Sequence, residues 1–289
     1  VYKRQDLRWD PQKDWQFLQG RNRSILRRTP EGRRELEEFE DAPILVDTRK
    51  KGNAGIDGAL ELNLERLAQV AAKKKVPIAT CRAYHGYKGA RGDIKAQNID
   101  GDEFQGLPNE LHLCEGARVI LTHNEWVEAG LMNGAGGDFR GFIWPQGGDP
   151  NSADEQKQAP LCLVVEFDDV DLGRDAEGKP RTFFPDVTLG LDKRGRERSL
   201  KCVPIFRQEV DAANVEHVKR SQFPLTLAWA LTHWKAQGMT LDRVRIRLST
   251  KTARQAGIGF VAMSRVKHVR HLIFEEDLPE WDVFQEAQW

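Results

Sequence analysis

The sequence predicts an α/β domain that is interrupted by a small β-barrel. Over residues 1–125, segments with helical periodicity alternate with short apolar runs, which is the element order of α/β folds. Residues 126–212 instead hold short apolar runs joined by long polar loops, a pattern typical of a small barrel. The α/β pattern returns over residues 213–289, so we expect the barrel to be an insertion.

The N-terminal part is expected to begin with helices around residues 15–18 and 32–36. Thr29 can cap the second of these because its hydroxyl can accept a hydrogen bond from a free backbone amide of the first turn. Pro30 suits the first helical position, where no amide hydrogen is needed. The apolar run at 42–47 then predicts a buried parallel strand.

The remaining elements follow from the same two periodicities. Apolar residues at helical spacing predict a helix over 60–70, and the lysines at 73–75 suit its C-terminus. Polar loops are expected at 145–160 and 171–199. Strands are expected at 76–79, 117–122, 134–144, 161–167, 200–206, 244–248 and 271–274, and helices at 226–236 and from 259.

Composition excludes several classes of protein. The 289 residues carry 44 Lys and Arg against 44 Asp and Glu, which excludes a wholly basic nucleic-acid coat. No apolar run approaches the roughly 18 residues of a membrane span. Because the chain starts at Val1, without an initiator methionine or signal sequence, we interpret it as a fragment or a processed product.

The four cysteines lack the closely spaced pairs that structural zinc sites need. With no secretory signal, we expect an intracellular protein with reduced and mostly buried thiols. These cysteines are Cys81, Cys114, Cys162 and Cys202.

No complete active site is visible in the sequence. The phosphate-binding pattern G-x-x-x-x-G-K-[ST] is absent, as are the nucleophile elbow and the dinucleotide fingerprint. Phe167-Asp168-Asp169 comes nearest to a magnesium-binding carboxylate pair, but it lies in the expected insertion. We therefore predict no metal site in this chain.

Two segments of the C-terminal part resemble motifs V and VI of superfamily-one helicases of the RecD-like, petite-integration-frequency (PIF) type. They are residues 223–242 (FPLTLAWALTHWKAQGMTLD) and 260–266 (FVAMSRV). A third block of that family is resembled by 116–124 (GARVILTHN) together with 130–135 (GLMNGA), and a fourth, motif IV, by 44–49 (ILVDTR) with Asn63 and Leu67. Four blocks in the family's order make the resemblance specific.

The resemblance implies the C-terminal half of an ATP-dependent motor. Such enzymes clamp ATP between two RecA-like domains, and this chain matches only the second, with its inserted SH3-like barrel. The domain would comprise residues 1–125 and 213–289, with the barrel at 126–212. ATP and Mg²⁺ would be held mainly by the other half, so the chain alone is expected to be inactive.

The family keeps an arginine finger at the position of Arg265. A planar, fixed cation stabilises the charge that spreads over the phosphoryl oxygens in the transition state, an effect worth roughly 10³–10⁵ in rate. Gln237 and Gly238 match the turn that links nucleotide state to strand grip, although a glycine also ends helices routinely. Thr240 is a candidate for the ribose and Arg49 for a phosphate; otherwise they are polar loop residues.

For the DNA strand, the resemblance points to Thr48, Thr232, Trp234 and Lys235. One departure concerns the family's histidine, whose position is taken by Trp234 while His233 lies one residue earlier. On a helix this shift rotates a side chain by about 100°. Trp234 would either stack on a base or fill the core.

The expected function is thus 5′-to-3′ translocation on single-stranded or forked DNA, in the nucleus or mitochondrion rather than the cytoplasm, without a membrane. One alternative is a non-catalytic nucleic-acid-binding or regulatory relic that lacks the ATP-binding half. A nuclease subunit of the RecD type is a third, although no nuclease carboxylate cluster is visible.

Overall fold

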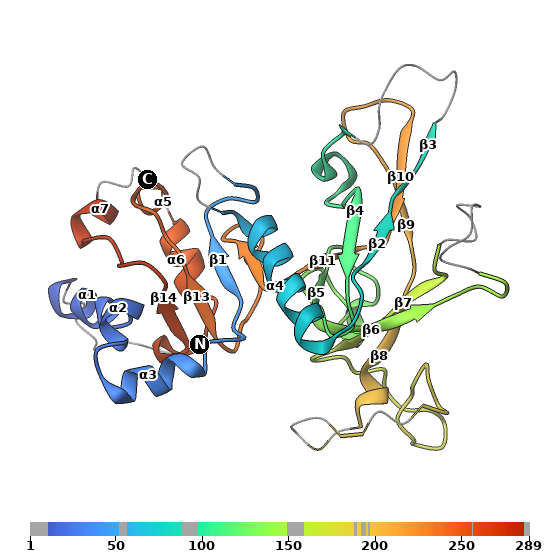
Figure 1. Ribbon diagram of the computed structural model, residues 1–289, viewed down its shortest axis with the longest axis horizontal. Helices are drawn as coiled ribbons and strands as arrows, with labels where there is room; N and C mark the ends of the chain where they lie inside the picture. The colour runs from blue at the N-terminus through green and yellow to red at the C-terminus, as the bar shows by residue number, and fades with distance from the viewer. Residues whose placement is uncertain are drawn as a thin grey trace. The chain divides into compact units, whose positions relative to one another are not determined.

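The computed structural model describes residues 11–51, 57–87, 98–148, 159–187, 190–191, 195, 197–255 and 257–285. The chain forms two compact units (Figure 1). Unit 1 comprises Val1–Asn63 and Trp229–Trp289, and unit 2 comprises Leu64–Ala228. Both termini of the chain therefore belong to unit 1, and unit 2 is an insertion into it.

Unit 1 is built on a four-stranded sheet whose neighbouring strands are all parallel. Its three-residue strands are apolar and mostly buried on both faces, as parallel sheets require. The order across the sheet is β12 (Ala230–Thr232), β1 (Ile44–Val46), β13 (Val244–Ile246) and β14 (Leu272–Phe274). The strands expected at 42–47, 244–248 and 271–274 are confirmed.

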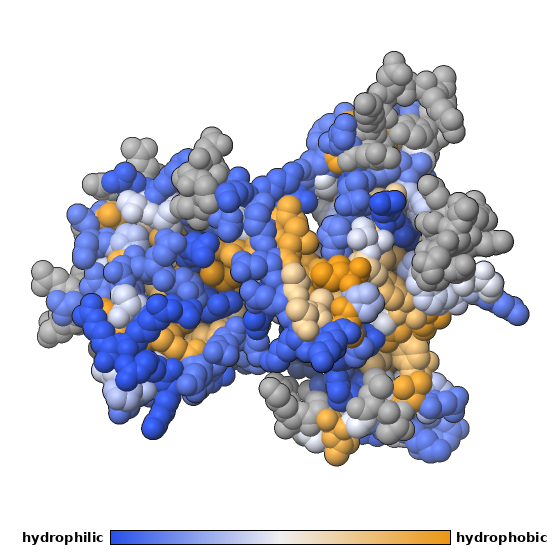
Figure 2. Space-filling view, in the orientation of Figure 1, coloured by the Kyte–Doolittle hydropathy of each residue, from blue (hydrophilic) through white to orange (hydrophobic). Residues whose placement is uncertain are grey.

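The rest of unit 1 contains several short helices. In Figure 2 the surface over α2 and α3 is largely hydrophilic, and the charged residues Arg33 and Arg34 of α3 are exposed there. The helical elements are α1 (Pro11–Gln19), α2 (Arg23–Leu26), α3 (Pro30–Glu37), α5 (Thr250–Ala253), α6 (Ile258–Met263), η5 (Val269–His271) and α7 (Trp281–Gln285). Helix α4 (Ala59–Lys74) begins in unit 1 and continues into unit 2.

The start of α3 follows from two residues. Thr29 has an extended backbone, and its hydroxyl accepts a hydrogen bond of 3.0 Å from the amide of Gly32. Pro30 occupies the first helical position. This confirms the expected cap, which satisfies one of the amides that a helix start leaves free.

The outer edge of β12 is occupied by a side chain from α4. The Asn63 amide donates to the carbonyl of Ala230 and accepts from its amide, both at 2.8 Å. Asn63 is buried, so these bonds are shielded from water. The pair fixes the start of α4 against the edge of the sheet.

Unit 2 contains antiparallel sheets. The largest has the order β11 (Leu225–Leu227), β5 (Arg118–Leu121), β6 (Gly136–Ile143), β7 (Cys162–Phe167) and β8 (Cys202–Ile205). The others are β3 (Tyr84–Tyr87), β10 (Val218–Gln222) and β9 (Gln208–Asp211), and the pair β2 (Ala79–Arg82) and β4 (Glu110–Leu113). Short 3₁₀ helices lie at η2 (Gly101–Phe104), η3 (Val127–Ala129) and η4 (Arg198–Lys201).

The α/β class is confirmed, whereas the barrel stays a prediction. Within the described residues no hydrogen-bonded ladder joins the edge strands β11 and β8. The division of the chain at 63/64 and 228/229 also lies outside the expected insertion of 126–212. The reason is that β5 and β11 pair with each other, so both strands lie in the same sheet as β6 and β7.

Two sequence-based expectations were wrong. The helix expected at 226–236 is instead β11, β12 and a series of turns. The run at 76–79, expected to be part of the α/β pattern, leads into β2, which starts at Ala79 and pairs antiparallel with β4.

The expectation for the cysteines is confirmed, since all four are free and buried. Burial raises the pKa of Cys81 and of Cys202 to about 11.

Candidate functional site

The carboxyl ends of neighbouring parallel strands bring several of the expected site residues together in unit 1. Val46 of β1 lies opposite Thr232 of β12. Because the two strands run in the same direction, Thr48 and Arg49 leave the sheet at the same edge as the segment that follows Thr232. Ligands of open α/β sheets bind at this edge.

Hydrogen bonds to backbone carbonyls hold the segment after β1 in place. The Thr48 hydroxyl donates to the carbonyl of Lys50 at 2.9 Å. The carbonyls of Thr48 and Arg49 accept from the amides of Ala59 and Leu60 at 2.9 and 2.8 Å. These bonds join the loop to the first turn of α4, and both the Thr48 and the Arg49 side chains remain exposed.

The segment after β12 is a compact turn. The Thr232 hydroxyl accepts from the amide of Lys235 at 3.2 Å, and the Thr232 carbonyl accepts from Ala236 at 3.1 Å. Gly238 has a φ of +83°, a conformation that favours glycine. The expected helix-to-loop turn is therefore a strand-to-loop turn.

Within this turn the side chains divide by exposure. Trp234 is 59% exposed, which removes the alternative that it fills the core. His233, at 2% exposure, points inward instead. Both residues belong to the turn that follows β12, and this turn directs the His233 side chain inward and the Trp234 side chain to solvent.

His233 pairs with Asp47, a contact between residues 186 positions apart that no sequence pattern predicts. Its Nε2 lies 3.1 Å from Asp47 Oδ1 and 3.1 Å from the carbonyl oxygen of Arg247. Both neighbours are acceptors, so Nε2 carries the hydrogen. The pair joins the carboxyl ends of β12, β1 and β13.

Asp47 is a carboxylate held by several donors. Its Oδ2 accepts from the amide of Ser249 at 3.3 Å. Burial acts to raise the pKa of Asp47, but hydrogen bonds from His233, Ser249 and Thr252 outweigh it and hold this pKa below its usual value. Asp47 is therefore ionised at neutral pH.

Arg265 follows α6 and lies against the same turn. Its Nε donates to the carbonyl of Val261 at 2.8 Å and its Nη2 to the Ser264 hydroxyl at 2.8 Å. Nη1 lies 3.4 Å and 3.3 Å from the carbonyls of Ala236 and Met239. The guanidinium thus contacts the residues that flank Gln237 and Gly238.

Backbone contacts strengthen this connection. The amide of Leu241 donates to the carbonyl of Arg265 at 2.8 Å, and Leu241 forms a parallel bridge with Val266. Thr240, directly before this bridge, is exposed, as are Gln237 and Gly238. Of the expected nucleotide-linked residues, these three therefore lie beside Arg265, while Arg49 lies at the carboxyl edge.

The described residues show no metal-binding group of three or more His, Cys, Asp or Glu side chains. Asp168, the nearest match to a magnesium ligand in the sequence, pairs with Arg118, whose Nη1 lies 2.8 Å from Asp168 Oδ1. This ion pair gives Asp168 a structural partner on β5. In the same described part, no helix is long and apolar enough to cross a membrane.

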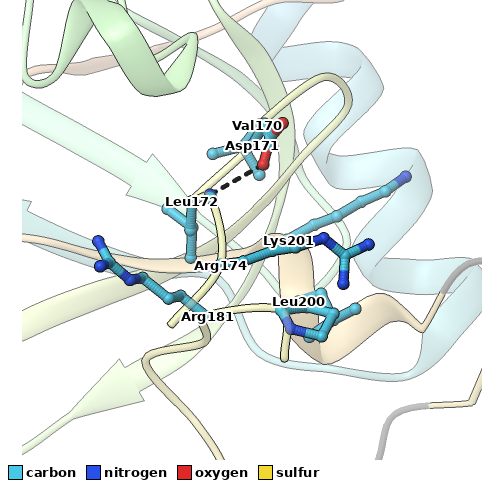
Figure 3. Close-up of a pocket in the computed structure, with 9 residues that line it drawn as sticks. Val170, Asp171, Leu172, Arg174, Arg181, Leu200 and Lys201 are labelled. Carbon is cyan, nitrogen blue, oxygen red and sulfur yellow. Dashed lines mark hydrogen bonds between the residues drawn. The ribbon is translucent and has the colours of Figure 1, made fainter. Parts of the chain in front are cut away.

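Unit 2 contains a cavity of about 300 Å³ between the 171–181 loop and η4. Arg174, Arg181 and Lys201 line it together with Asp171. In Figure 3, Arg174 and Lys201 extend to one side and Arg181 to the other, so the three cations do not converge on one point. This arrangement does not form a compact site for a single anion.

Comparison with known proteins identifies the relatives of this chain. No protein-family model matches it. The Pif1 ATP-dependent DNA helicase of Psychrobacter sp. is 34% identical over 174 residues, which cover 57% of this chain and 26% of that protein. Human PIF1 is 32% identical over 162 residues, covering 56% of this chain and 19% of that protein. The chain is homologous to Pif1 ATP-dependent DNA helicases.

The chain matches only about a fifth to a quarter of the length of these Pif1 relatives. Among solved structures, Pif1 helicase from Candida albicans aligns with 95% of this chain and 57% of its own chain, with a TM-score of 0.53 and 19% identity. At this identity the likeness concerns the fold alone. It supports a RecA-like α/β architecture.

Proposed function

We propose that this chain is the C-terminal portion of an ATP-dependent DNA helicase that moves 5′ to 3′ on single-stranded DNA. The observation that carries the proposal is the turn at residues 232–240. It joins the carboxyl edge of the parallel sheet, where Thr48 and Arg49 lie, to the guanidinium of Arg265. The homology to Pif1 helicases supplies the class of reaction.

Arg265 acts as the arginine finger in this proposal. Its Nε is anchored firmly to Val261, whereas the contacts of Nη1, at 3.3 and 3.4 Å, are at the long end of hydrogen bonds. Exchange of these carbonyls for a phosphate oxygen would strengthen the bonds, because charge-assisted bonds are shorter and stronger. The backbone of Arg265 would not have to move.

Movement of the Arg265 side chain would change the contacts of the adjacent turn. Loss of the Nη1 contacts releases the carbonyls of Ala236 and Met239, which flank Gln237 and Gly238. The same turn begins at Thr232 and carries Trp234 and Lys235. We propose that this turn couples the state of the bound nucleotide to the affinity for the DNA strand. Thr240 would contact the ribose of the nucleotide.

The strand-binding side consists of groups at the carboxyl edge, of which Thr48 and Trp234 are exposed and Thr232 and Lys235 are half-buried. Trp234 offers an exposed ring for base stacking, and Thr48 lies at the same edge. Lys235 would supply a cation and Thr232 a hydroxyl to the DNA strand. Arg49, at the same edge, would instead contact a phosphate of the nucleotide. The proposed ligand on this side is single-stranded or forked DNA.

ATP and Mg²⁺ would be held mainly by a half of the motor that carries a phosphate-binding loop. The described residues around Arg265 fit this division, since they offer a cation and backbone groups but no carboxylate cluster. When bound, Mg²⁺ supplies charge neutralisation at the phosphates. We also propose that β6, β7 and β8 belong to an SH3-like barrel inserted at 126–212.

The test uses a protein that contains this chain together with the ATP-binding half. Arg265→Ala should lower the DNA-stimulated ATPase rate by about 10³-fold or more, since a finger is worth roughly 10³–10⁵. Binding of a labelled single strand should remain. Arg34→Ala, an exposed arginine of α3, is the matched control. Normal turnover in Arg265→Ala would remove the finger assignment, and ATP hydrolysis by the 289-residue chain alone would contradict the proposed division of labour.

The alternative is a non-catalytic nucleic-acid-binding relic. The observation that favours it is that Arg265 already has acceptors within its own unit. In that case the longer protein would bind single strands but show no DNA-stimulated ATPase, and Arg265→Ala would change only stability. The same assays therefore separate the two functions.

A further inference from the structure

Helix α6 presents a large aromatic ring to solvent. Its inward residues Ile258, Gly259 and Ala262 are buried. Gly259 allows close packing, because a Cβ there would lie 2.8 Å from a ring atom of Phe284. Phe260, on the outward side, is 71% exposed, the largest value among the exposed large hydrophobic residues of the described part. Nothing in the packing of unit 1 accounts for a ring in this place.

Phe260 and Arg265 are connected along the outward side of the helix end. The amide of Ser264 donates to the carbonyl of Phe260 at 2.9 Å, so the two residues are one helical turn apart. The Ser264 hydroxyl accepts from Arg265 Nη2 at 2.8 Å. Ring, hydroxyl and guanidinium therefore follow one another along the surface.

The surrounding segment is basic. Residues 250–271 contain five Lys or Arg and no Asp or Glu, although the whole chain is neutral. Four of these cations are exposed: Lys251, Arg254, Lys267 and Arg270. An excess of one sign of charge along an exposed segment raises the local concentration of anions.

We propose that Phe260 stacks on the base of the nucleoside triphosphate whose phosphates meet Arg265. This inference rests on the proposed function and adds a positioning residue to it. The segment offers one exposed ring among several cations, which matches a ligand with one base and several phosphate charges. A strand of nucleic acid would present several bases, and Phe260 is the sole Phe, Trp or Tyr of residues 250–271.

Stacking predicts a defined loss. Removal of a base–aromatic contact should weaken ATP binding about 5- to 150-fold, which corresponds to roughly 1–3 kcal/mol at 1.36 kcal/mol per factor of ten. Because the ring is exposed, its replacement should leave folding unchanged. The effect should appear in the KM for ATP and leave kcat nearly unaltered, since the ring contacts ground state and transition state alike.

The experiment measures ATP binding to a protein that contains this chain together with the ATP-binding half, by saturation-transfer NMR on the adenine protons. Phe260→Ala and Phe260→Leu should weaken the adenine signal, whereas Phe260→Tyr should keep it. Phe17→Ala is the control, because Phe17 of α1 is also exposed, at 56%, but lies outside the basic segment. Inorganic tripolyphosphate should compete with ATP, and the strength of this competition measures how much the phosphate groups contribute to binding.

Three outcomes would overturn the proposal. Phe260→Ala could bind ATP as the unaltered protein does, or Phe260→Leu could bind ATP normally, which would show that any apolar side chain suffices. Binding of an oligothymidine that falls with Phe260→Ala while ATP binding does not would assign the ring to a strand instead.

The two proposals can fail separately. In a protein with the ATP-binding half, Arg265→Ala without effect but Phe260→Ala with a raised KM would remove the finger and keep the stacking. Loss of activity in Arg265→Ala with an unchanged KM in Phe260→Ala would do the reverse.

Discussion

Arg220 of unit 2 is fully enclosed, whereas Arg265 of unit 1 is only partly buried. Arg220 donates to His85 Nε2 and to the carbonyls of Leu107 and Ile99 at 2.9–3.0 Å, and its guanidinium lies 4.0 Å from the ring centroid of Phe104. Arg265 has short bonds through Nε and Nη2, both at 2.8 Å, whereas the contacts of its Nη1 among the described residues are the two at 3.3 and 3.4 Å. Each of the three guanidinium nitrogens of Arg220 has a short bond, and the long contacts of Arg265 Nη1 make that nitrogen the one we propose to meet a ligand.

The same contrast extends to the environment of each group. Burial, and then the charge of Arg220, lower the pKa of His85, which keeps it neutral and able to accept. Arg207, also in unit 2, lies 4.5 Å and 4.6 Å from the ring centroids of Tyr84 and Phe223. In unit 1 the rings of Trp234 and Phe260 are instead exposed to solvent, at 59% and 71%. Arg207 and Arg220 thus stabilise the fold of unit 2, whereas Arg265 of unit 1 is the cation that we propose to contact a ligand.

The largest effect that would test this comparison is expected from Arg220→Ala. The change leaves buried acceptors without a donor, at about 1–3 kcal/mol each, so unfolding should become easier by roughly 3–5 kcal/mol. The measurement is the thermal or urea unfolding transition. Arg174→Ala, an exposed arginine of the same unit, is the control and should change stability by less than about 0.5 kcal/mol. Equal effects of the two changes would contradict a structural role for Arg220.

A smaller effect is expected from Asp47→Asn, and it should depend on pH. The pKa of Asp47 is lower in the folded than in the unfolded chain, so the ionised carboxylate stabilises the fold. This contribution is complete above about pH 4, the usual Asp value, and is lost as the pH falls through the folded pKa. Near neutral pH the variant should be less stable by about 1–2 kcal/mol. The difference in unfolding midpoint between parent and variant should shrink below pH 4; a constant difference would contradict the lowered pKa.

The smallest change in stability, within about 0.5 kcal/mol, is expected from Trp234→Ala, because the ring is exposed. Binding of a fluorescent oligothymidine should nevertheless weaken about 5- to 150-fold, the range for loss of one stacked base. Trp126→Ala, a tryptophan of unit 2 with 40% exposure, is the matched control. Equal losses in both variants would mean that unit 1 has no special part in strand binding.

Local signals in the sequence predicted local structure well. Thr29 and Pro30 predicted the start of α3, since a cap depends only on residues within one turn. The apolar runs predicted β1, β5, β7, β8, β13 and β14. Residues 226–236 failed because Leu227, Ala230 and Leu231 fit a helical period as well as a short strand buried on both faces.

Strand β10 was missed for a different reason. Its buried positions are Val218, Arg220 and Gln222, so the inward face of the strand is largely polar. No hydropathy pattern marks such a strand, because Arg220 and Gln222 are acceptable inside only through hydrogen-bond partners supplied by distant residues.

For the candidate site, motif resemblance located Arg265 and the 232–240 turn but not what they contact. The Asp47–His233 pair arises because β1 and β12 are neighbours in the sheet, which spacing along the chain does not reveal. The inward direction of His233 likewise depends on the turn that follows β12. Tertiary topology, rather than local preference, decides these contacts.

The amide of Asn63 has one more consequence. A terminal strand such as β12 would ordinarily leave a row of backbone donors and acceptors on which a foreign strand could add itself. Asn63 occupies both groups of Ala230 at the middle of the free side. In the described part of the chain, the Asn63 side chain therefore hinders a strand of another molecule from pairing with the free edge of β12. Proteins often protect such an edge with a proline, a charged residue or a β-bulge, and here one amide side chain does so instead.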